Sequence, residues 1–286
     1  MSYAQPNVLI DCCRFPAHDS SIQSLHRNGN LEVKPRISYI IGSVQRSGTH
    51  LLCSILRSTG AGSPDEYFFS KRGQTWEERW GTSSRAAYVE RIFQRHTTAE
   101  GVFGFVVMWA YFDRVVQMLQ EIPAYENFNE SQLLAAVFNR PKYIWMRRRN
   151  RIQQAVSWAI ALQTGVWAQK TGEEPQLCAI PRFDFDVIDG LYNRIVAGEV
   201  GWTNYFHKNQ IDPLVLFYED VVASNRDAAR RVLEFLGLPF PPAFEIAPPT
   251  VQKQGTELSE EWAASYFKLK ENKMGKLARI IRRIRN

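Results

Sequence analysis

One apolar run, followed at once by a glycine-containing turn and a helical pattern, constrains the fold of this chain most strongly. Residues 37–41, Ile-Ser-Tyr-Ile-Ile, are almost continuously apolar, as in strands buried on both faces of a parallel sheet. The turn 42–50, Gly-Ser-Val-Gln-Arg-Ser-Gly-Thr-His, follows directly. Apolar residues recur at helical spacing over 51–56, before Gly60, where a helix commonly ends. The pattern predicts a buried strand, a turn and a helix in immediate succession.

Three further apolar segments, 102–109, 143–146 and 214–218, are typical of strands in the same sheet. Each is followed by polar residues and then by a helical pattern. After the last of them, Ser224 and Asp227 resemble a capping box at the start of a helix that ends before a glycine. This alternation of strands and helices predicts an α/β fold with three layers and a mainly parallel sheet.

The two ends of the chain depart from this alternation. Residues 1–35 are polar and irregular, which predicts an N-terminal extension before one domain over 36–270. Beyond a proline-rich connector at 239–249, the segment 260–270 and a basic C-terminal tail, 271–286, each fit a helix. The tail holds much of the formal net charge of +6, so the rest of the chain is only mildly basic.

Composition and cysteine placement exclude several classes of protein. The 286 residues, 45% of them hydrophobic, suffice for one large core. The four cysteines form neither a CxxC pair nor a zinc-binding pattern with histidine, so we expect no metal and a reducing compartment. No segment approaches the ~20 apolar residues that span a bilayer, and the first residues lack a signal-peptide pattern. We therefore expect a cytoplasmic protein without a membrane span.

The turn at 42–50 has the composition of an anion-binding site. Successive backbone N–H groups and the positive end of the helix dipole point at a negative group in such turns. Arg46, Ser47 and Thr49 can add side-chain donors. A plain turn capped by serine and threonine explains a lone Ser-Gly-Thr equally well. The ATP-binding Walker loop does not fit, because the second glycine comes one residue late and no lysine follows it.

A Gln-Arg-Ser-Gly-Thr turn after a strand resembles the 5′-phosphosulfate loop of sulfotransferases that use 3′-phosphoadenosine 5′-phosphosulfate (PAPS). The resemblance implies a P-loop-like sulfotransferase fold with PAPS as co-substrate and no metal. It also implies that Arg46 faces the transferred sulfonate. The donor contacts implied in this turn are Arg46, Ser47, Gly48, Thr49 and His50.

Residues 147–157, which follow a predicted strand, look like the 3′-phosphate site of the same family. There an arginine after the strand and a serine two helical turns later hold the phosphate, and the arginine fork can form two charge-assisted hydrogen bonds. Spacing to the Gln-Ala-Val-Ser run assigns Arg148 and Ser157, with Arg149 as the alternative. Four arginines in five residues are also compatible with a solvated charge run or a nucleic-acid-binding patch.

Residues 59–69 resemble the bacterial trehalose sulfotransferase branch, in which the corresponding segment carries a glutamate as the proposed catalytic base. Glu66 occupies that position. A carboxylate within hydrogen-bond reach can accept the proton of the attacking group. Without the resemblance, Glu66 would be interpreted as a surface carboxylate. The aromatic residues 67–69 either line an acceptor pocket or fill the core.

The resemblance extends over about 37–262, through Gly-Val-Phe-Gly at 101–104, Gly-Trp at 201–202 and Tyr-Glu-Asp at 218–220. Near its end, Lys253 and Gln254 fall where sulfotransferases place a loop that folds over the donor.

Three residues depart from the trehalose branch. Ser63, Val106 and Ala110 stand where that branch has a glutamate, a lysine and an asparagine. Each hydroxyl of a sugar needs a placed partner for specific recognition, so we expect an acceptor other than trehalose.

The sequence thus predicts transfer of a sulfuryl group from PAPS to a hydroxyl or amine of a small molecule, such as a natural product, carbohydrate or glycolipid. Glu66 and Arg46 are the predicted catalytic residues. A P-loop kinase is one alternative, although the Walker lysine is absent. A non-enzymatic nucleic-acid-binding protein that uses residues 147–151 and the tail is the other. We expect no nucleic-acid partner, and the sequence leaves open whether the chain forms a homodimer.

Overall fold

The structure, a computed structural model, describes residues 31, 34–69, 78, 81–168, 177–240 and 257–285. Most of the predicted N-terminal extension therefore lies outside the described residues. Lys253 and Gln254 lie outside them as well.

Within the described residues, four parallel strands form one sheet in the order β2-β1-β3-β4. The strands are β1 (Ile37–Ser43), β2 (Val102–Met108), β3 (Lys142–Arg147) and β4 (Leu214–Phe217). All four overlap the apolar segments, which confirms the predicted α/β fold. Strands β2 and β4 each end one residue before the apolar segment does, because Trp109 and Tyr218 already belong to the helices that follow. Strand β1 runs on to Ser43, and β3 also includes Lys142 and Arg147.

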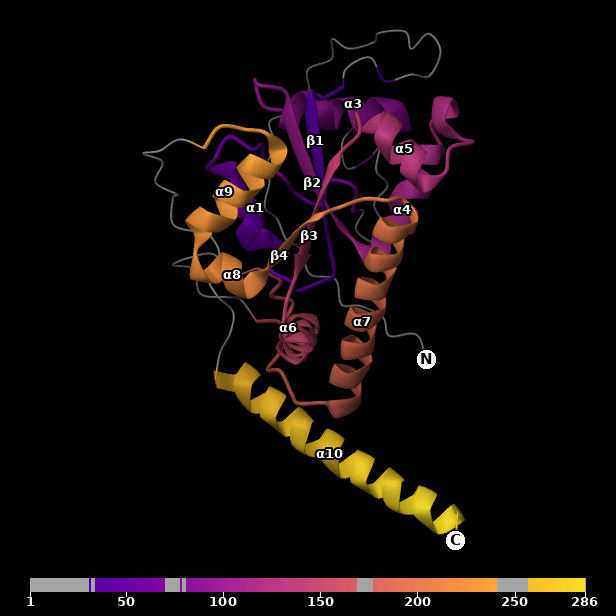
Figure 1. Cartoon of the computed structure of the whole chain (residues 1–286), viewed down its shortest axis with the longest axis vertical. Coiled ribbons are helices and arrows are strands. Elements are labelled where there is room, and N and C mark those ends of the chain that lie inside the picture. The colour runs from indigo at the N-terminus through magenta and orange to yellow at the C-terminus, as the bar shows by residue number, and fades with distance from the viewer. Residues whose placement is uncertain are drawn as a thin grey trace.

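Helices cover both faces of the sheet (Figure 1). On one side lie α1 (Thr49–Arg57), α8 (Tyr218–Ala223) and α9 (Asn225–Leu236). On the other lie α3 (Arg85–His96), α4 (Trp109–Gln120), the short 3₁₀ helix η1 (Pro123–Tyr125), α5 (Glu130–Val137) and α7 (Phe185–Lys208). Helix α6 (Arg151–Thr164) follows β3, and α10 (Glu257–Arg285) packs against α6 and α7. Among the described helices, none is both long and apolar enough to cross a bilayer.

The two faces of the sheet are packed with different side chains. On the α3, α4, α5 and α7 side the core is rich in aromatic rings, among them Phe68, Phe93, Phe103, Phe105 and Phe138. The α1 and α9 side is mainly aliphatic. Burial of both faces explains why the strands read as continuous apolar runs rather than as alternating ones.

Helix α7 is anchored to the end of β1 by a fully buried tryptophan. The indole N–H of Trp202 donates to the carbonyl of Ser43 at 2.9 Å. A Cβ at Gly42 would lie 2.9 Å from the same indole, so only glycine lets the ring pack here. The start of the 42–50 turn is thereby fixed against the core.

Two helix ends differ from the sequence expectation. Helix α1 ends at Arg57 rather than near Gly60, because the N–H groups of Ser58 and Thr59 bond back to the carbonyls of Ile55 and Leu56, 3.1 Å each. The segment 260–270 and the basic tail are parts of one continuous helix, α10. In contrast, α9 begins as predicted, with Ser224 Oγ accepting from the Asp227 N–H at 3.1 Å.

Candidate active site

The turn at residues 42–50, here called the anion loop, connects the carboxyl end of β1 to the first turn of α1. Two of its residues have left-handed backbone conformations, Arg46 (φ 67) and Gly48 (φ 93). A Cβ at Gly48 would lie 2.3 Å from the Tyr218 ring, so glycine is required there for space as well as for conformation. Gly48 is the N-cap, and no described side chain caps α1. The first backbone N–H groups of α1 therefore face the loop, where they can donate hydrogen bonds to an anion.

Side chains from three elements hold the anion loop in shape. Ser43 Oγ donates to the Met146 carbonyl of β3 at 2.6 Å and also shares a hydrogen bond with Ser47 Oγ. From α6, Gln154 Nε2 donates to the Gln45 carbonyl at 2.8 Å. The buried Ser47 hydroxyl thus serves the loop itself, and Ser47 is left to contact an anion through its backbone N–H. Because these bonds are buried, the loop is organised before any ligand binds.

Arg46 joins the two motifs that resemble phosphate sites. Its Nε donates to Ser157 Oγ of α6 at 3.0 Å, and its guanidinium also donates to the Trp167 carbonyl. Burial, followed by repulsion from Arg148, lowers the pKa of Arg46 to about 10, so the group stays charged at neutral pH. Ser157, 111 positions along the chain from Arg46, is therefore in direct contact with the anion loop.

The four arginines at 147–151, here called the arginine turn, have different partners. Arg147 and Arg151 both pair with the buried carboxylate of Glu199 on α7, at 2.9 and 2.8 Å. Arg149 is exposed and forms a two-pronged pair with Asp220 at 2.7 and 2.8 Å. These three guanidinium groups are occupied by carboxylates.

Arg148 is placed differently from its neighbours. Its guanidinium lies 4.8 Å from the centre of the Tyr218 ring and donates to Gln153 Oε1 at 3.3 Å. Its Nε is buried without a hydrogen-bond partner among the described residues. Burial lowers the pKa of Arg148, although Tyr218 and Glu219 each act to raise it. Arg46 and Arg148 thus repel each other at the anion loop, and a bound anion would relieve that repulsion.

Glu66 lies in a segment, residues 59–69, that runs beside the edge strand β2. The Val106 N–H donates to the Asp65 carbonyl at 2.9 Å, which extends the sheet by one contact. The Asp65 carboxylate reaches Arg57 at 3.6 Å. Glu66 is half-buried and lies near Tyr111, in the first turn of α4. Burial raises the pKa of the Tyr111 hydroxyl, and the negative charge of Glu66 raises it further.

Two of the three aromatic residues after Glu66 fill the core. Tyr67 and Phe68 are buried in the aromatic core. Phe69 instead packs on Tyr111, with ring centres 4.7 Å apart, on the same side as Glu66. His50 is exposed in the first turn of α1.

Tyr111 and Gln45 are site residues that the sequence did not single out. The side chain of Gln45 lies close enough to the Tyr111 hydroxyl to offset part of the rise in its pKa. Tyr111 therefore connects the anion loop to the Glu66 segment. The available signal was its position just after β2, beside Ala110, where the chain departs from the trehalose branch.

The Tyr-Glu-Asp run at 218–220 also acquires structural roles. Tyr218 lies under Arg148 and against Gly48. Glu219 accepts the backbone N–H groups of Arg149 and Asn150 at 3.1 and 3.3 Å. The run thus orients the arginine turn, a structural role that the spacing of motifs in the sequence does not predict.

The residues replaced relative to the trehalose branch lie around the same region. Ser63 Oγ accepts from Arg57 Nε at 3.3 Å, Val106 is buried in β2, and Ala110 is exposed at the start of α4. Among the described residues, no group of three or more His, Cys, Asp and Glu side chains could hold a metal ion.

Comparison with known proteins gives two kinds of match. The family model described as Stf0 sulphotransferase matches residues 38–268. The trehalose 2-sulfotransferase of Mycolicibacterium smegmatis is 27% identical over 259 residues, covering 80% of this chain and 94% of that protein. The trehalose 2-sulfotransferase of Mycobacterium tuberculosis is 25% identical over 255 residues, covering 80% and 93%.

Proposed function

The chain belongs to the Stf0 sulphotransferase family, and on that basis we propose that it transfers a sulfuryl group from PAPS to a hydroxyl or amine of a small-molecule acceptor. The observation that carries the choice of donor is the convergence of two cations on an uncapped helix. Next to the first turn of α1, Arg148 lies close enough to Arg46 to help lower the pKa of Arg46, after burial. A donor that carries both a 3′-phosphate and a 5′-phosphosulfate supplies negative groups for such a pair of neighbouring cations.

Each end of the donor has proposed partners. The phosphosulfate contacts the backbone of Ser47, Gly48, Thr49 and His50, with Arg46 on the sulfonate. The 3′-phosphate contacts Arg148 and Ser157. Arg149 is the weaker candidate, because its guanidinium is already paired with Asp220 at 2.7 and 2.8 Å. Lys253 and Gln254 remain proposed donor contacts outside the described residues.

The proposed reaction is an in-line displacement at sulfur. The acceptor oxygen or nitrogen forms a bond to sulfur while the bond from sulfur to the bridging phosphate oxygen breaks, which releases 3′-phosphoadenosine 5′-phosphate (PAP). Glu66 takes the proton of the attacking group. Arg46 and the loop N–H groups stabilise the negative charge that grows on the leaving oxygen, by analogy with phosphoryl transfer.

The proposed acceptor is a natural product, carbohydrate or glycolipid other than trehalose. Although the two similar proteins are trehalose 2-sulfotransferases, Ser63, Val106 and Ala110 supply none of the charged or amide groups of that branch. The ring of Phe69 against Tyr111 adds apolar surface beside Glu66. A pocket with fewer polar partners favours an acceptor with fewer hydroxyl groups at this position.

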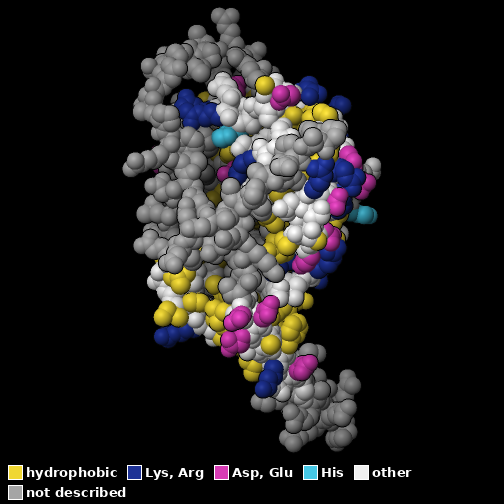
Figure 2. All heavy atoms as spheres, turned by 90° about the vertical axis from the view of Figure 1, so that its left-hand side faces the viewer, with side chains coloured by type: hydrophobic (Ala, Val, Ile, Leu, Met, Phe, Trp, Pro, Cys, Tyr) yellow, Lys and Arg dark blue, Asp and Glu magenta, His cyan; other side chains and the backbone are white. Residues whose placement is uncertain are grey.

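The pairing of the arginines argues against the nucleic-acid alternative. Arg147, Arg149 and Arg151 are all bonded to carboxylates. On the face shown in Figure 2, described basic and acidic side chains lie close together rather than forming one continuous basic surface. We propose that the protein acts in the cytoplasm on a small molecule, with PAPS and without a metal.

Calorimetry with PAP and with adenosine 5′-monophosphate tests the proposed donor. We expect PAP to bind more tightly, and Arg148→Ala to weaken PAP about tenfold to a hundredfold, as for a lost charged hydrogen bond. Arg149→Ala is the matched control and should change PAP affinity little. Equal affinity for the two nucleotides would refute the 3′-phosphate site, and a larger loss in Arg149→Ala would move it by one residue.

A further inference from the structure

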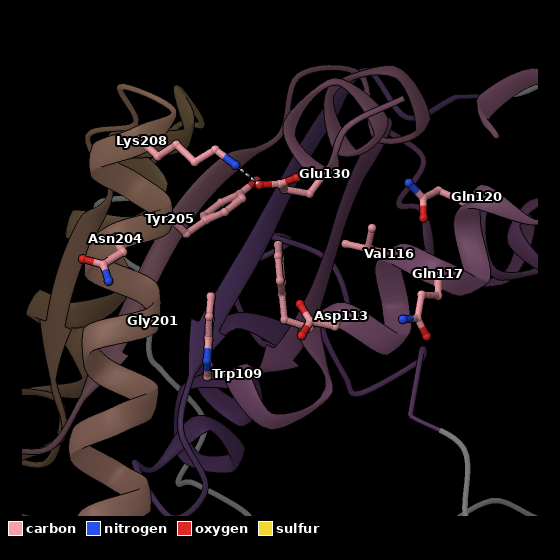
Figure 3. Close-up of a pocket in the computed structure, with 11 residues that line it drawn as sticks. Trp109, Asp113, Val116, Gln117, Gln120, Glu130, Gly201, Asn204, Tyr205 and Lys208 are labelled. Carbon is pink, nitrogen blue, oxygen red and sulfur yellow. Dashed lines mark hydrogen bonds and ion pairs between the residues drawn. The ribbon is translucent and has the colours of Figure 1, made fainter. Parts of the chain in front are cut away.

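A cavity of about 530 Å³ lies between α4 and α7, outside the residues assigned to sulfuryl transfer. Figure 3 shows side chains from the two helices directed toward one hollow, with Glu130 of α5 at its edge. Its size is within the range of about 300–1,000 Å³ that is usual for small-molecule sites.

The floor of the cavity consists of aromatic rings that are held in place by packing. Trp109 and Phe112 are stacked, with ring centres 5.3 Å apart and planes 8° apart, and Tyr205 meets Phe112 edge-on at 4.9 Å. A Cβ at Gly201 would lie 2.1 Å from the Trp109 indole, so a glycine on α7 is needed for the indole to occupy this position. The floor is therefore rigid and apolar.

The rim of the cavity carries polar side chains on both helices. Asp113, Gln117 and Gln120 come from α4, and Asn204 and Lys208 come from α7 (Figure 3). At one end Lys208 Nζ donates to Glu130 Oε1 at 2.7 Å, and this hydrogen bond is the main cause of the lowered pKa of Glu130. Asp113 has no ion-pair or hydrogen-bond partner among the described residues, so its carboxylate can accept from a ligand.

The charges on the rim select against some ligands. Asp113 and Glu130 contribute two negative charges and Lys208 one positive charge, which gives a net charge of −1 among the lining residues. A phosphate or sulfate ester would be repelled by this rim. The side-chain amides of Gln117 and Asn204 supply both donors and acceptors to a ligand with many hydroxyl groups, whereas Gln120 Nε2 already donates to the Phe128 carbonyl at 2.9 Å.

We propose that this cavity binds a carbohydrate of about one or two sugar rings, whose C–H face lies on the partly buried Trp109 indole and whose hydroxyl groups bond to Asp113, Gln117 and Asn204. The cavity is a separate site from the one that holds Glu66. Trp109 and Phe112 pack into the aromatic core, whereas Tyr111, between them in sequence, packs on the aliphatic core of the opposite face of the sheet. The first turn of α4 thus has one side toward each site.

Calorimetry and ligand-observed NMR with maltose, cellobiose and lactose test the proposal, in the presence of saturating PAP so that the donor site is filled. We expect at least one of these sugars to bind with a Kd of about 1 mM. Asp113→Ala and Asn204→Ala should each weaken it about tenfold, because each removes a hydrogen bond to the sugar. His207→Ala, an exposed change on α7 outside the cavity lining, is the matched control and should bind normally.

Two results would overturn the carbohydrate site. One is the absence of binding for all three sugars while PAP still binds with its usual affinity, a result that would leave the proposed sulfuryl transfer intact. The other is sugar binding that survives Asp113→Ala and Asn204→Ala but is lost in Glu66→Gln, which would place the sugar at the acceptor site. Loss of PAP binding in the unmodified chain would instead count against the proposed donor.

Discussion

The anion loop and the Glu66 segment lie side by side in the site but are held in different ways. Ser43, Ser47 and Thr49 of the loop are buried, and hydrogen bonds from β1, β3 and α6 hold it. The Glu66 segment is attached at the sheet edge, and its ion pair between Arg57 and Asp65 is about half exposed. The proposed donor side is therefore organised before binding, whereas the exposed Asp65 and the half-buried Glu66, on the proposed acceptor side, can be replaced with less cost to the fold.

Arg46→Ala should have the largest effect, because it removes a cation from the proposed reaction centre. We expect a loss of roughly 10²- to 10³-fold in turnover, the scale seen when a donor to developing charge is removed. PAP affinity should fall less, since PAP lacks the sulfonate. Single-turnover kinetics with PAPS, together with calorimetry of PAP, measure the two effects.

Arg46→Lys sharpens the same comparison. A lysine keeps the positive charge but lacks the guanidinium fork that bonds both Ser157 and the Trp167 carbonyl. Arg46→Lys should therefore retain part of the activity that Arg46→Ala loses. Equal losses of turnover and of PAP affinity in Arg46→Ala would make the residue a general anchor of the nucleotide.

Glu66→Gln should lower turnover roughly 10²-fold or more, as for a missing general base, while folding and PAP affinity stay unchanged. The amide keeps the shape of the side chain and cannot accept the proton. Steady-state rates with the acceptor, measured beside calorimetry of PAP, separate the two quantities.

Asp65→Asn is the matched control for Glu66→Gln. Its carboxylate accepts the backbone N–H of Glu66 at 2.7 Å and reaches Arg57 at 3.6 Å, and because an asparagine oxygen can still accept that N–H, the change should cost little turnover. A crippled Asp65→Asn beside an active Glu66→Gln would shift the proposed base by one residue. Activity in both variants would assign the proton to another group.

Gly48→Ala should weaken PAP binding by about tenfold or more, since a strained left-handed residue costs about 1–3 kcal/mol and the added methyl group meets the Tyr218 ring. Gly60→Ala is the control: it has φ 76 but no atom within 4 Å of its added Cβ, so it tests strain without the clash. Thermal unfolding and PAP calorimetry on both variants check this. Similar losses of PAP affinity in the two would show that the packing against Tyr218 contributes little.

Tyr111→Phe should have the smallest effect, about two- to tenfold in kcat/KM, the scale of one hydrogen bond. The change removes the hydroxyl beside Gln45 and keeps the ring against Phe69. PAP affinity should not change. An equal loss of PAP affinity would indicate that Tyr111 supports the loop rather than the acceptor side.

Much of the fold could be predicted because its signals are local. Each strand is a continuous apolar run, since both faces of a parallel sheet are buried, and the strand-to-helix turn is contiguous in sequence. The family resemblance, which the family model confirms, rested on the same contiguous motifs. The helix ends were less accurate, because they depend on which N–H groups bond back, as at Ser58 and Thr59.

The α/β fold, the anion loop and the two arginine-bearing motifs could be recognised from the sequence, because neighbouring residues along the chain suffice to form them. How those motifs meet depends on contacts in the folded chain. Glu199 and Asp220 come from distant helices, and their pairing with Arg147, Arg151 and Arg149 leaves Arg148 beside Arg46. Tyr111 and the α4–α7 cavity likewise depend on packing between segments that are far apart in the chain, and periodicity and spacing carry no information on such contacts.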